Sequence, residues 1–129
     1  MTTPPSGNDV GTKATILVID DDDDIRAVLA MVLDEAGFRV VTAANGREAL
    51  EHLREDPQPD VILLDLMMPE MDGYQFRAEQ QRDPALRAIP TLIVTAGTVT
   101  SRVEALGAEA ILRKPVSLRR LVDTIRRFC

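Results

Sequence analysis

The sequence predicts an α/β domain in which a doubly wound, five-stranded parallel sheet is covered by helices on both faces. Five short apolar runs alternate with stretches of helical periodicity over residues 14–129. Most of these runs are apolar at successive positions rather than at every second position, which is typical of strands buried on both faces. Right-handed crossovers then place helices on both sides of the sheet. We therefore expect one domain over residues 14–129, preceded by a disordered tail, rich in Pro, Gly and Thr, over residues 1–13.

The five apolar runs predict the strands. The third run is interrupted by one charged residue, Asp65, near its carboxyl end. The expected strands cover residues 15–19, 39–44, 61–66, 91–96 and 110–113.

Helical patterns follow the runs. The first helix carries apolar residues at the i, i+3, i+4, i+7 and i+8 positions of one face and ends at Gly37. Further helices are expected around Leu50, over about residues 74–82, near residues 98–106, and from Ser117 onward. The apolar face of the first helix consists of Ile25, Val28, Leu29, Val32 and Leu33.

The composition excludes several classes of protein. The apolar fraction of 45% and the charged fraction of 28% are those of a globular protein, and no apolar run is long enough to cross a bilayer. The net charge of −6 argues against direct nucleic-acid binding, although basic residues gather after Arg113, where we interpret them as a solvated helix face. Cys129 is the single cysteine and no signal segment is present, so we expect a cytoplasmic protein with no membrane partner.

Side chains suited to chemistry lie at the carboxyl ends of four expected strands. Asp20 and Asp21 follow the first strand, Asp65 ends the third, Thr95 ends the fourth and Lys114 follows the fifth. In an open parallel sheet these ends meet at one edge, where ligands bind. Three crowded carboxylates repel one another unless a cation is bound, and Mg²⁺ prefers oxygen ligands. A carboxylate nucleophile beside a cation, a lysine and a hydroxyl suits phosphoryl transfer.

Four segments carry a resemblance to a known family. The segments "ILVIDDDDDIR", "VILLDLMMPEMDGY", "TLIVTA" and "GAEAILRKP" occur in this order. Together they resemble the receiver domain of two-component response regulators, over about residues 14–128, and the run from Asp65 to Gly73 is the most specific part. The resemblance implies a flavodoxin-like fold with strand order 2-1-3-4-5 and five helices.

The resemblance implies that Asp65 is the phosphoacceptor of a phosphorelay or two-component system. Asp20, Asp21 and Asp65, with the backbone carbonyl of Met67, are expected to hold Mg²⁺. The implied donor is a histidine kinase or a phosphotransfer protein, and the acyl phosphate is expected to change binding to a downstream protein. Such a domain catalyses only its own phosphorylation and dephosphorylation, so no other enzymatic activity is expected.

The resemblance makes Lys114 the phosphate-binding ammonium and Thr95 the switch hydroxyl, but the chain departs from the family near the switch. Ile111 stands three residues before Lys114, where receivers commonly carry an aromatic residue. An isoleucine packs in the same groove but offers no ring hydroxyl to a partner. The segment from Gly97 to Leu106 is shorter than the family norm by about one helical turn, so we expect a short fourth helix. A short fourth helix in turn implies a different partner geometry, or no conventional dimer, across this surface.

Other interpretations remain open. A degenerate receiver, acting as a phosphorylation-independent binding module, is favoured by Ile111 and the short fourth helix, and opposed by the complete set of site groups. The run from Asp20 to Asp22 also satisfies the D-x-D motif of aspartate-nucleophile phosphohydrolases, but the further motifs and the cap of that class are missing. A Toprim-like nuclease would need a glutamate after the first strand and a later D-x-D motif, where this chain has Asp20 and the run Asp65-Leu66-Met67. The last expected helix ends the chain, so we expect a stand-alone receiver, although a piece of a longer regulator also fits.

Overall fold

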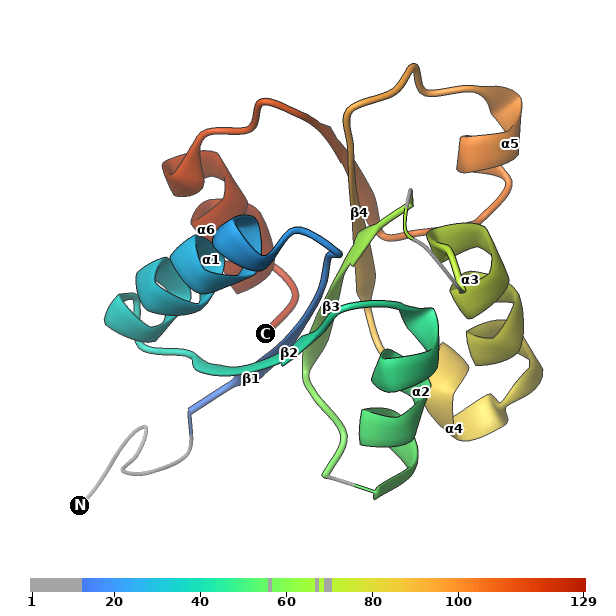
Figure 1. Cartoon of the computed structure of the whole chain (residues 1–129), viewed down its shortest axis with the longest axis horizontal. Helices are drawn as coiled ribbons and strands as arrows, with labels where there is room; N and C mark the ends of the chain where they lie inside the picture. The colour runs from blue at the N-terminus through green and yellow to red at the C-terminus, as the bar shows by residue number, and fades with distance from the viewer. Residues whose placement is uncertain (1–12, 56, 67, 69–70) are drawn as a thin grey trace.

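The computed structural model describes residues 13–55, 57–66, 68 and 71–129. Its five strands are all parallel and follow the order β2-β1-β3-β4-β5, which confirms the predicted topology (Figure 1). Each strand ends within a residue of its expected position. The strands are β1 (Thr15–Ile19), β2 (Arg39–Ala43), β3 (Val61–Asp65), β4 (Thr91–Thr95) and β5 (Ala110–Arg113).

The described residues form six helices, so the prediction of five helices was wrong by one. The additional helix, α4 (Pro84–Arg87), is a single turn that directly follows α3. Pro84 cannot continue α3 but suits the first turn of a new helix, whose N-cap is Asp83. The other helices are α1 (Asp23–Glu35), α2 (Gly46–Glu55), α3 (Gly73–Arg82), α5 (Ser101–Glu104) and α6 (Leu118–Arg126).

The helix expected to be short is α5, which has four residues. Its N-cap, Thr100, accepts a hydrogen bond from the Val103 amide, and Val103 is its buried residue. In the described part of the chain, none of the helices is long and apolar enough to cross a membrane. The tail expected over residues 1–13 lies outside the described residues except for Lys13.

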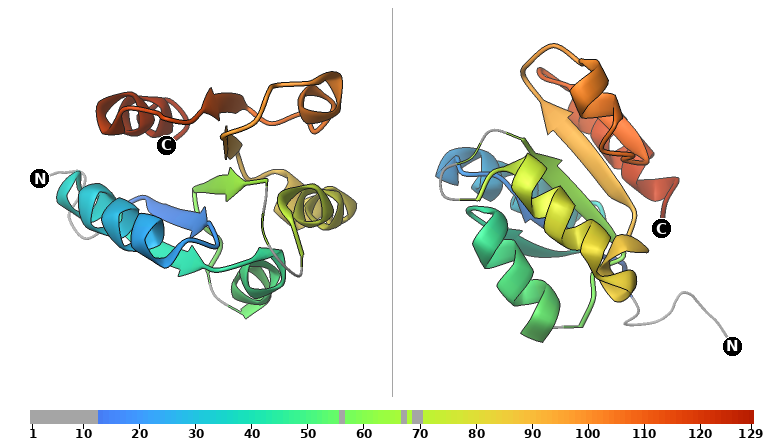
Figure 2. Two further views of the ribbon diagram at one scale, coloured as in Figure 1. Left: turned by 45° about the horizontal axis from the view of Figure 1, so that its top comes forward. Right: turned by 90° about the vertical axis from the view of Figure 1, so that its right-hand side faces the viewer.

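The sheet separates two apolar clusters, one on each face. Leu33 of α1 and Leu121 of α6 pack on one face. Leu50 of α2, Phe76 of α3 and Val103 of α5 pack on the other. Figure 2 shows the two helical layers on either side of the sheet. This arrangement leaves the carboxyl ends of the strands open between the layers, at the edge where the predicted site residues lie.

The first helix is fixed at both ends by local hydrogen bonds. The Asp22 side chain is its N-cap and accepts from the amides of Asp24 and Ile25. At its other end Gly37 adopts φ of 101°, and the amide of Phe38 donates to the carbonyl of Leu33, as in a Schellman motif. The predicted role of Gly37 as the end of this helix is therefore confirmed.

The apolar face of α1 is less buried than its periodicity predicts. Leu33 is fully buried, but Ile25 is 36% and Val28 is 46% exposed. These two side chains line a groove between α1 and α6, so among the described residues α6 does not fully cover this part of α1. The pattern correctly identified one face of the helix, but not how far that face is covered.

Candidate functional site

Three carboxylates lie together at the carboxyl edge of the sheet. Asp20 follows β1, and Asp65 is the last residue of the neighbouring strand β3. One carboxylate oxygen each of Asp20, Asp21 and Asp65 lies within 4.8 Å of the other two. Asp20 and Asp65 are 5% and 8% exposed, whereas Asp21 is open to solvent. The sequence-predicted acidic cluster is therefore brought together by the fold.

Lys114 lies beside this cluster. Its Nζ is 3.4 Å from Oδ2 of Asp20 and 3.7 Å from Oδ2 of Asp65. The lysine follows β5, two strands away from β3, and its ammonium therefore reaches past the end of β4. Its side chain remains 27% exposed, so the ammonium is accessible to a ligand.

Thr95 ends β4, the strand between those that carry Asp65 and Lys114. It is 4% exposed, and its Oγ1 accepts a 3.3 Å hydrogen bond from the amide of Gly97. Its backbone carbonyl accepts a 2.8 Å hydrogen bond from the amide of Lys114. The ends of β4 and β5 are thus joined at the two residues predicted to contact a phosphoryl group.

Asp20 is held by contacts that the sequence analysis did not identify. Its Oδ1 accepts from the amide of Asp22, and its own amide donates to the carbonyl of Ala43. Nη1 of Arg26 donates a 2.7 Å hydrogen bond to the backbone carbonyl of Asp20, and the same guanidinium pairs with Asp23. The i, i+3 spacing of Asp23 and Arg26 could have predicted their ion pair, but not the bond from Arg26 to the Asp20 carbonyl.

Gly73 allows α3 to begin directly against the end of β3. A Cβ at this position would lie 2.6 Å from the carbonyl oxygen of Asp65 and 2.6 Å from Cα of Leu66. The helix start is fixed by a capping box, in which Asp72 and Gln75 exchange side chain to amide hydrogen bonds. The absence of a side chain at Gly73 therefore sets how closely the helix approaches the site.

Of the predicted site positions Met67 and Ile111, the structure describes only Ile111. Met67, predicted to offer its backbone carbonyl to the metal, lies outside the described residues. Ile111 pairs with Ile93 in the sheet register and packs, partly buried, against the cluster on the α2, α3 and α5 face. An apolar, partly buried Ile111 is consistent with its expected packing role.

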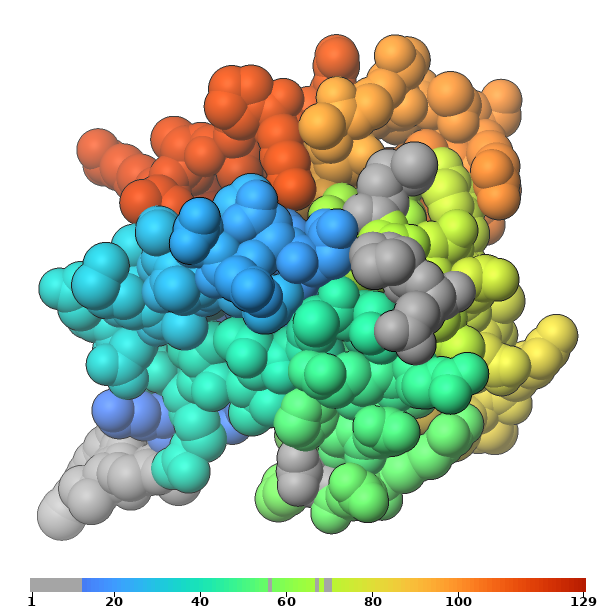
Figure 3. Space-filling model, in the orientation of Figure 1, coloured from blue at the N-terminus to red at the C-terminus, as the bar shows by residue number. Residues whose placement is uncertain are grey.

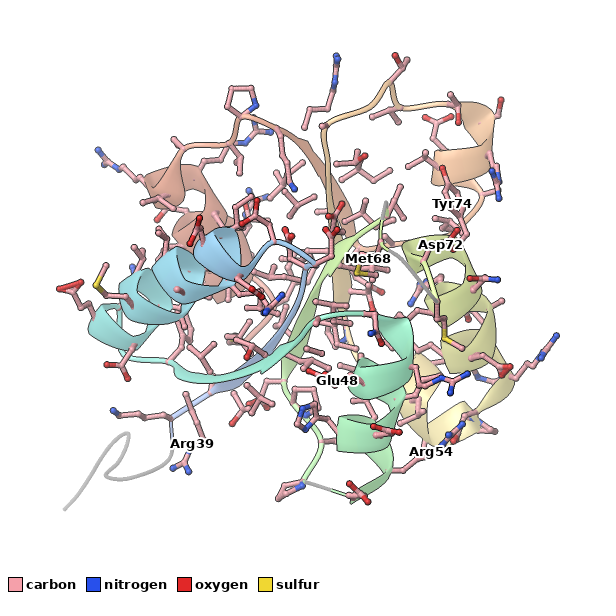
Figure 4. All side chains as sticks on the ribbon, viewed as in Figure 1. Arg39, Glu48, Arg54, Met68, Asp72 and Tyr74 are labelled. Atoms are coloured by element: carbon pink, nitrogen blue, oxygen red, sulfur yellow. The ribbon has the colours of Figure 1, made fainter. Side chains whose placement is uncertain are left out.

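An aromatic residue that the sequence analysis missed packs on the same cluster as Ile111. Tyr74, at the start of α3, lies beside α5 (Figure 4). The guanidinium carbon of Arg102 on α5 lies 3.8 Å from the centre of its ring, which is a cation–π contact. Because Tyr74 and Arg102 are 28 positions apart in the sequence, no local pattern predicts this pairing.

The donor set at the carboxyl edge fits a hard divalent cation. Each of the three carboxylates offers an oxygen atom, and thiolate and imidazole ligands are absent from this described cluster. Mg²⁺ takes oxygen ligands and retains several water molecules, so a site with a few carboxylates on one side suits it. Asp20, Asp21 and Asp65 are therefore the residues that would hold it.

Comparison with known proteins decides the family. Residues 16–126 match the family described as response regulator receiver domain. The chain belongs to this family. Receiver domains are signalling modules of two-component systems rather than conventional enzymes, and the receiver resemblance proposed from four sequence segments is thereby confirmed.

Curated relatives of this receiver domain include both long and short proteins. It is 39% identical over 121 residues to the "Probable transcriptional regulator ycf27" of Guillardia theta, covering 92% of this chain and 46% of that protein. It is 30% identical over 117 residues to the "Polar-differentiation response regulator DivK" of Brucella anthropi, covering 88% of this chain and 94% of that protein. The receiver domain thus spans about half the length of some curated relatives.

Solved structures agree with this assignment. The chemotaxis protein CheY4 of Vibrio cholerae superposes on the receiver domain with a TM-score of 0.82 at 34% identity, covering 92% of this chain and 100% of that one. A response regulator from Chloroflexus aurantiacus superposes with a TM-score of 0.84 at 32% identity, covering 91% and 98% of the two chains. The flavodoxin-like fold is therefore shared with these receivers.

Proposed function

We propose that this receiver domain accepts a phosphoryl group on Asp65 from the phosphohistidine of a histidine kinase or phosphotransfer protein, in a Mg²⁺-dependent reaction that alters binding to a downstream protein. The observation that supports this proposal is the position of Lys114 Nζ, 3.4 Å from Asp20 and 3.7 Å from Asp65, beside three clustered carboxylates. A nucleophile, a fixed ammonium and a set of metal ligands are the groups that phosphoryl transfer needs.

In the proposed reaction the Asp65 carboxylate attacks phosphorus in line with the leaving imidazole nitrogen. The new O–P bond forms as the N–P bond breaks, and the electron pair of that bond remains on the imidazole. Lys114 offsets negative charge on the transferring oxygens, since its ammonium is already held beside Asp65. The chemistry that Mg²⁺ supplies when bound by Asp20, Asp21 and Asp65 is further neutralisation of the same oxygens.

The acyl phosphate then acts on Thr95. It adds a charge of about −1.5 to −2 beside a buried hydroxyl that now accepts from the Gly97 amide. In the phosphorylated state the Thr95 hydroxyl donates a hydrogen bond to a phosphoryl oxygen, and the segment from Thr95 to Gly97 moves with it. Because the Thr95 carbonyl is bonded to the Lys114 amide, the end of β5 responds as well.

The test is phosphorylation by a small donor. The purified chain is incubated with acetyl phosphate and Mg²⁺, and intact mass spectrometry is expected to detect one base-labile phosphoryl adduct. The adduct is expected to be absent in Asp65→Asn and without Mg²⁺, and to remain in the control Asp34→Asn on the exposed end of α1. An adduct that persists in Asp65→Asn would rule out Asp65 as the acceptor.

A second candidate is a phosphorylation-independent binding module with a receiver fold. It is favoured by the aliphatic Ile111 in the cluster near α5 and by the four-residue length of α5. Failure of the wild-type chain to form an adduct with acetyl phosphate, or with any histidine kinase or phosphotransfer protein, would favour this candidate over phosphoryl transfer.

A further inference from the structure

The chain around Asp20 is held by a hydrogen bond at each of three successive peptide units. The Asp20 amide donates a 3.1 Å hydrogen bond to the carbonyl of Ala43, and the Asp22 amide donates a 2.9 Å hydrogen bond to Oδ1 of Asp20. The peptide unit between these two is held by a side chain, since Nη1 of Arg26 donates a 2.7 Å hydrogen bond to the Asp20 carbonyl. The turn that carries the acidic pair is thus fixed in part by a residue of the helix that follows it.

The carbonyl that Arg26 holds belongs to the peptide unit that joins Asp20 to Asp21. A peptide unit is planar, so a hydrogen bond to its oxygen restricts the rotation of the whole plane and the direction in which the next residue projects its side chain. Because the donor is a cation, the bond is charge-assisted and stronger than a bond between neutral groups. Arg26 therefore influences where the Asp21 carboxylate lies, although its bond is to the backbone.

Asp21 is the member of the acidic cluster that depends most on this backbone support. Asp20 and Asp65 are buried, whereas Asp21 is open to solvent. Figure 3 shows the beginning of α1, in blue, at the molecular surface between the C-terminal segment and the chain that follows β2. Packing orders an exposed carboxylate little, so the backbone that carries Asp21 sets where its oxygen lies relative to the other two carboxylates of the cluster.

Arg26 is itself fixed by a second contact. Its Nη2 pairs with Oδ1 of Asp23, and the side chain of Arg26 is only 18% exposed. A planar guanidinium donates in two fixed directions at once, which the compact ammonium of a lysine does not. The Asp23 carboxylate also offsets the charge of Arg26, so this cation opposes the binding of a metal ion nearby less than an unpaired cation would.

We propose that Arg26 is a positioning residue for the Mg²⁺ site, which holds the peptide plane between Asp20 and Asp21 and so keeps the Asp21 carboxylate beside those of Asp20 and Asp65. Residues that orient metal ligands without binding the metal commonly contribute about 10- to 100-fold to metal affinity. The proposal rests on the metal site of the proposed function, but not on phosphoryl transfer to Asp65.

Two simpler roles for Arg26 predict different results. If Arg26 only stabilises α1 through its i, i+3 pair with Asp23, its loss lowers stability but leaves the Mg²⁺ affinity of the folded chain unchanged. If Arg26 only contributes its charge, its loss strengthens Mg²⁺ binding, because a positive charge near the site is removed. A positioning role predicts weaker binding, so the direction of the change separates the three roles.

The test titrates the whole isotope-labelled chain with magnesium chloride at constant ionic strength and follows the backbone amides by NMR. Arg26→Met keeps a long side chain with high helix propensity but lacks the guanidinium, and it is expected to bind Mg²⁺ about tenfold more weakly than the wild type. Arg26→Lys retains a cationic donor and is expected to have an intermediate affinity. The matched control, Arg54→Met in the last turn of α2, removes the same charge from an exposed position and should bind like the wild type.

A second readout needs no metal. The amide nitrogen of Asp21 belongs to the peptide unit whose oxygen Arg26 holds, so its chemical shift in the metal-free chain is expected to change in Arg26→Met and to change less in Arg26→Lys. The same spectra show whether each variant remains folded. An Asp21 nitrogen shift that is unchanged in Arg26→Met would overturn the proposal, because the bond would then not hold this peptide unit in solution.

The titration separates this proposal from the proposed function. A folded Arg26→Met chain that binds Mg²⁺ as tightly as the wild type, or more tightly, would overturn the positioning role, and so would an Arg26→Lys chain that binds no better than Arg26→Met. If the wild type does not bind Mg²⁺, the positioning role and the metal site fail together. If the wild type binds Mg²⁺ but forms no phosphoryl adduct, phosphoryl transfer fails, and the affinities of the variants still decide the role of Arg26.

Discussion

The guanidinium of Arg77 on α3 donates a 2.9 Å hydrogen bond from Nη2 to the carbonyl oxygen of Gly107, 30 residues further along the chain. Nε of the same side chain donates to the carbonyl of Leu106, and Nη1 donates to Gln80 and Thr91. Arg77 is only 3% exposed. The segment that follows α5 is therefore joined to α3 by the hydrogen bonds of a buried cation.

The first prediction concerns this cation. Burial lowers the pKa of the Arg77 guanidinium, and the Glu109 carboxylate partly opposes that shift. Desolvation of the charged guanidinium is therefore unfavourable, and the hydrogen bonds of Arg77 offset it. Arg77→Leu is expected to lower the free energy of unfolding by about 2–4 kcal/mol, because it leaves buried acceptors unpaired. Arg77→Leu with Gln80→Leu should cost less than the sum of the single changes, as measured by urea denaturation. Strict additivity would contradict the shared network.

The second prediction separates members of the acidic run. Asp22→Ala removes the N-cap of α1 and is expected to lower the free energy of unfolding by about 1 kcal/mol. Asp24→Ala loses a favourable interaction with the helix dipole and is expected to cost about 0.3–1 kcal/mol. Thermal unfolding followed by circular dichroism compares the two. A larger loss of unfolding free energy in Asp24→Ala than in Asp22→Ala would show that the N-cap hydrogen bonds of Asp22 are not the main stabilising interaction at the start of α1.

The third prediction uses two glycines. Gly73→Ala places a Cβ against backbone atoms of Asp65 and Leu66 that cannot move independently, so it is expected to cost about 1–3 kcal/mol of stability. It should also slow phosphorylation by displacing Asp65. Gly97→Ala is the control, because the nearest atom to its Cβ, Oγ1 of Thr95, lies 3.8 Å away. Equal effects of the two substitutions on the unfolding midpoint would contradict the steric explanation.

The fourth prediction concerns the proposed metal site. Saturating Mg²⁺ is expected to raise the melting temperature, and at about 100 times the dissociation constant a single site adds about 2.7 kcal/mol of stability. Asp21→Asn should abolish most of the shift, since it removes an exposed ligand without disturbing the core. Asp22→Asn should retain it, because asparagine caps the helix equally well. Differential scanning fluorimetry with and without EDTA provides the measurement.

The fifth prediction concerns the terminal cysteine. Cys129 is exposed as a residue, but partial burial of its thiol and then the negative charge of Asp60 raise the pKa of that thiol. The thiolate fraction at neutral pH is therefore low, and alkylation by iodoacetamide should be slow. A pKa raised by folding also means that the stability contributed by this thiol is lost as pH rises through its folded value. Asp60→Asn should speed alkylation while keeping an oxygen for the Thr15 amide. An unchanged rate would show that the charge of Asp60 does not reach the thiol.

The strands and the positions of the candidate site residues could be predicted because both follow from the local sequence and the sheet topology. In a parallel sheet, a polar residue that ends a buried apolar run must lie at the common carboxyl edge, and Asp65 and Lys114 follow this rule. Asp22 could be interpreted only in part, since a capping role depends on backbone angles that a run of five aspartates does not reveal.

Features that depend on distant partners could not be predicted. Arg77 falls in a largely polar helix, and its burial follows from carbonyl groups about 30 residues away. Periodicity marked Ile25 and Val28 as one helix face, but how far α6 covers that face is a matter of packing between helices. The one-turn helix at Pro84 was missed because four residues are too few to show a hydrophobic period.

Successive residues of β4 point into different halves of the molecule. Leu92 belongs to the cluster beneath α1 and α6, and Ile93 belongs to the cluster beneath α2, α3 and α5. Thr95 ends this strand and is bonded to Lys114 on β5. We therefore expect the proposed displacement of Thr95 to affect the packing on both faces of the sheet. Natural variation that adapts one surface to a new partner is then constrained by the other, and compensating substitutions are expected to occur in pairs on opposite sides of the sheet.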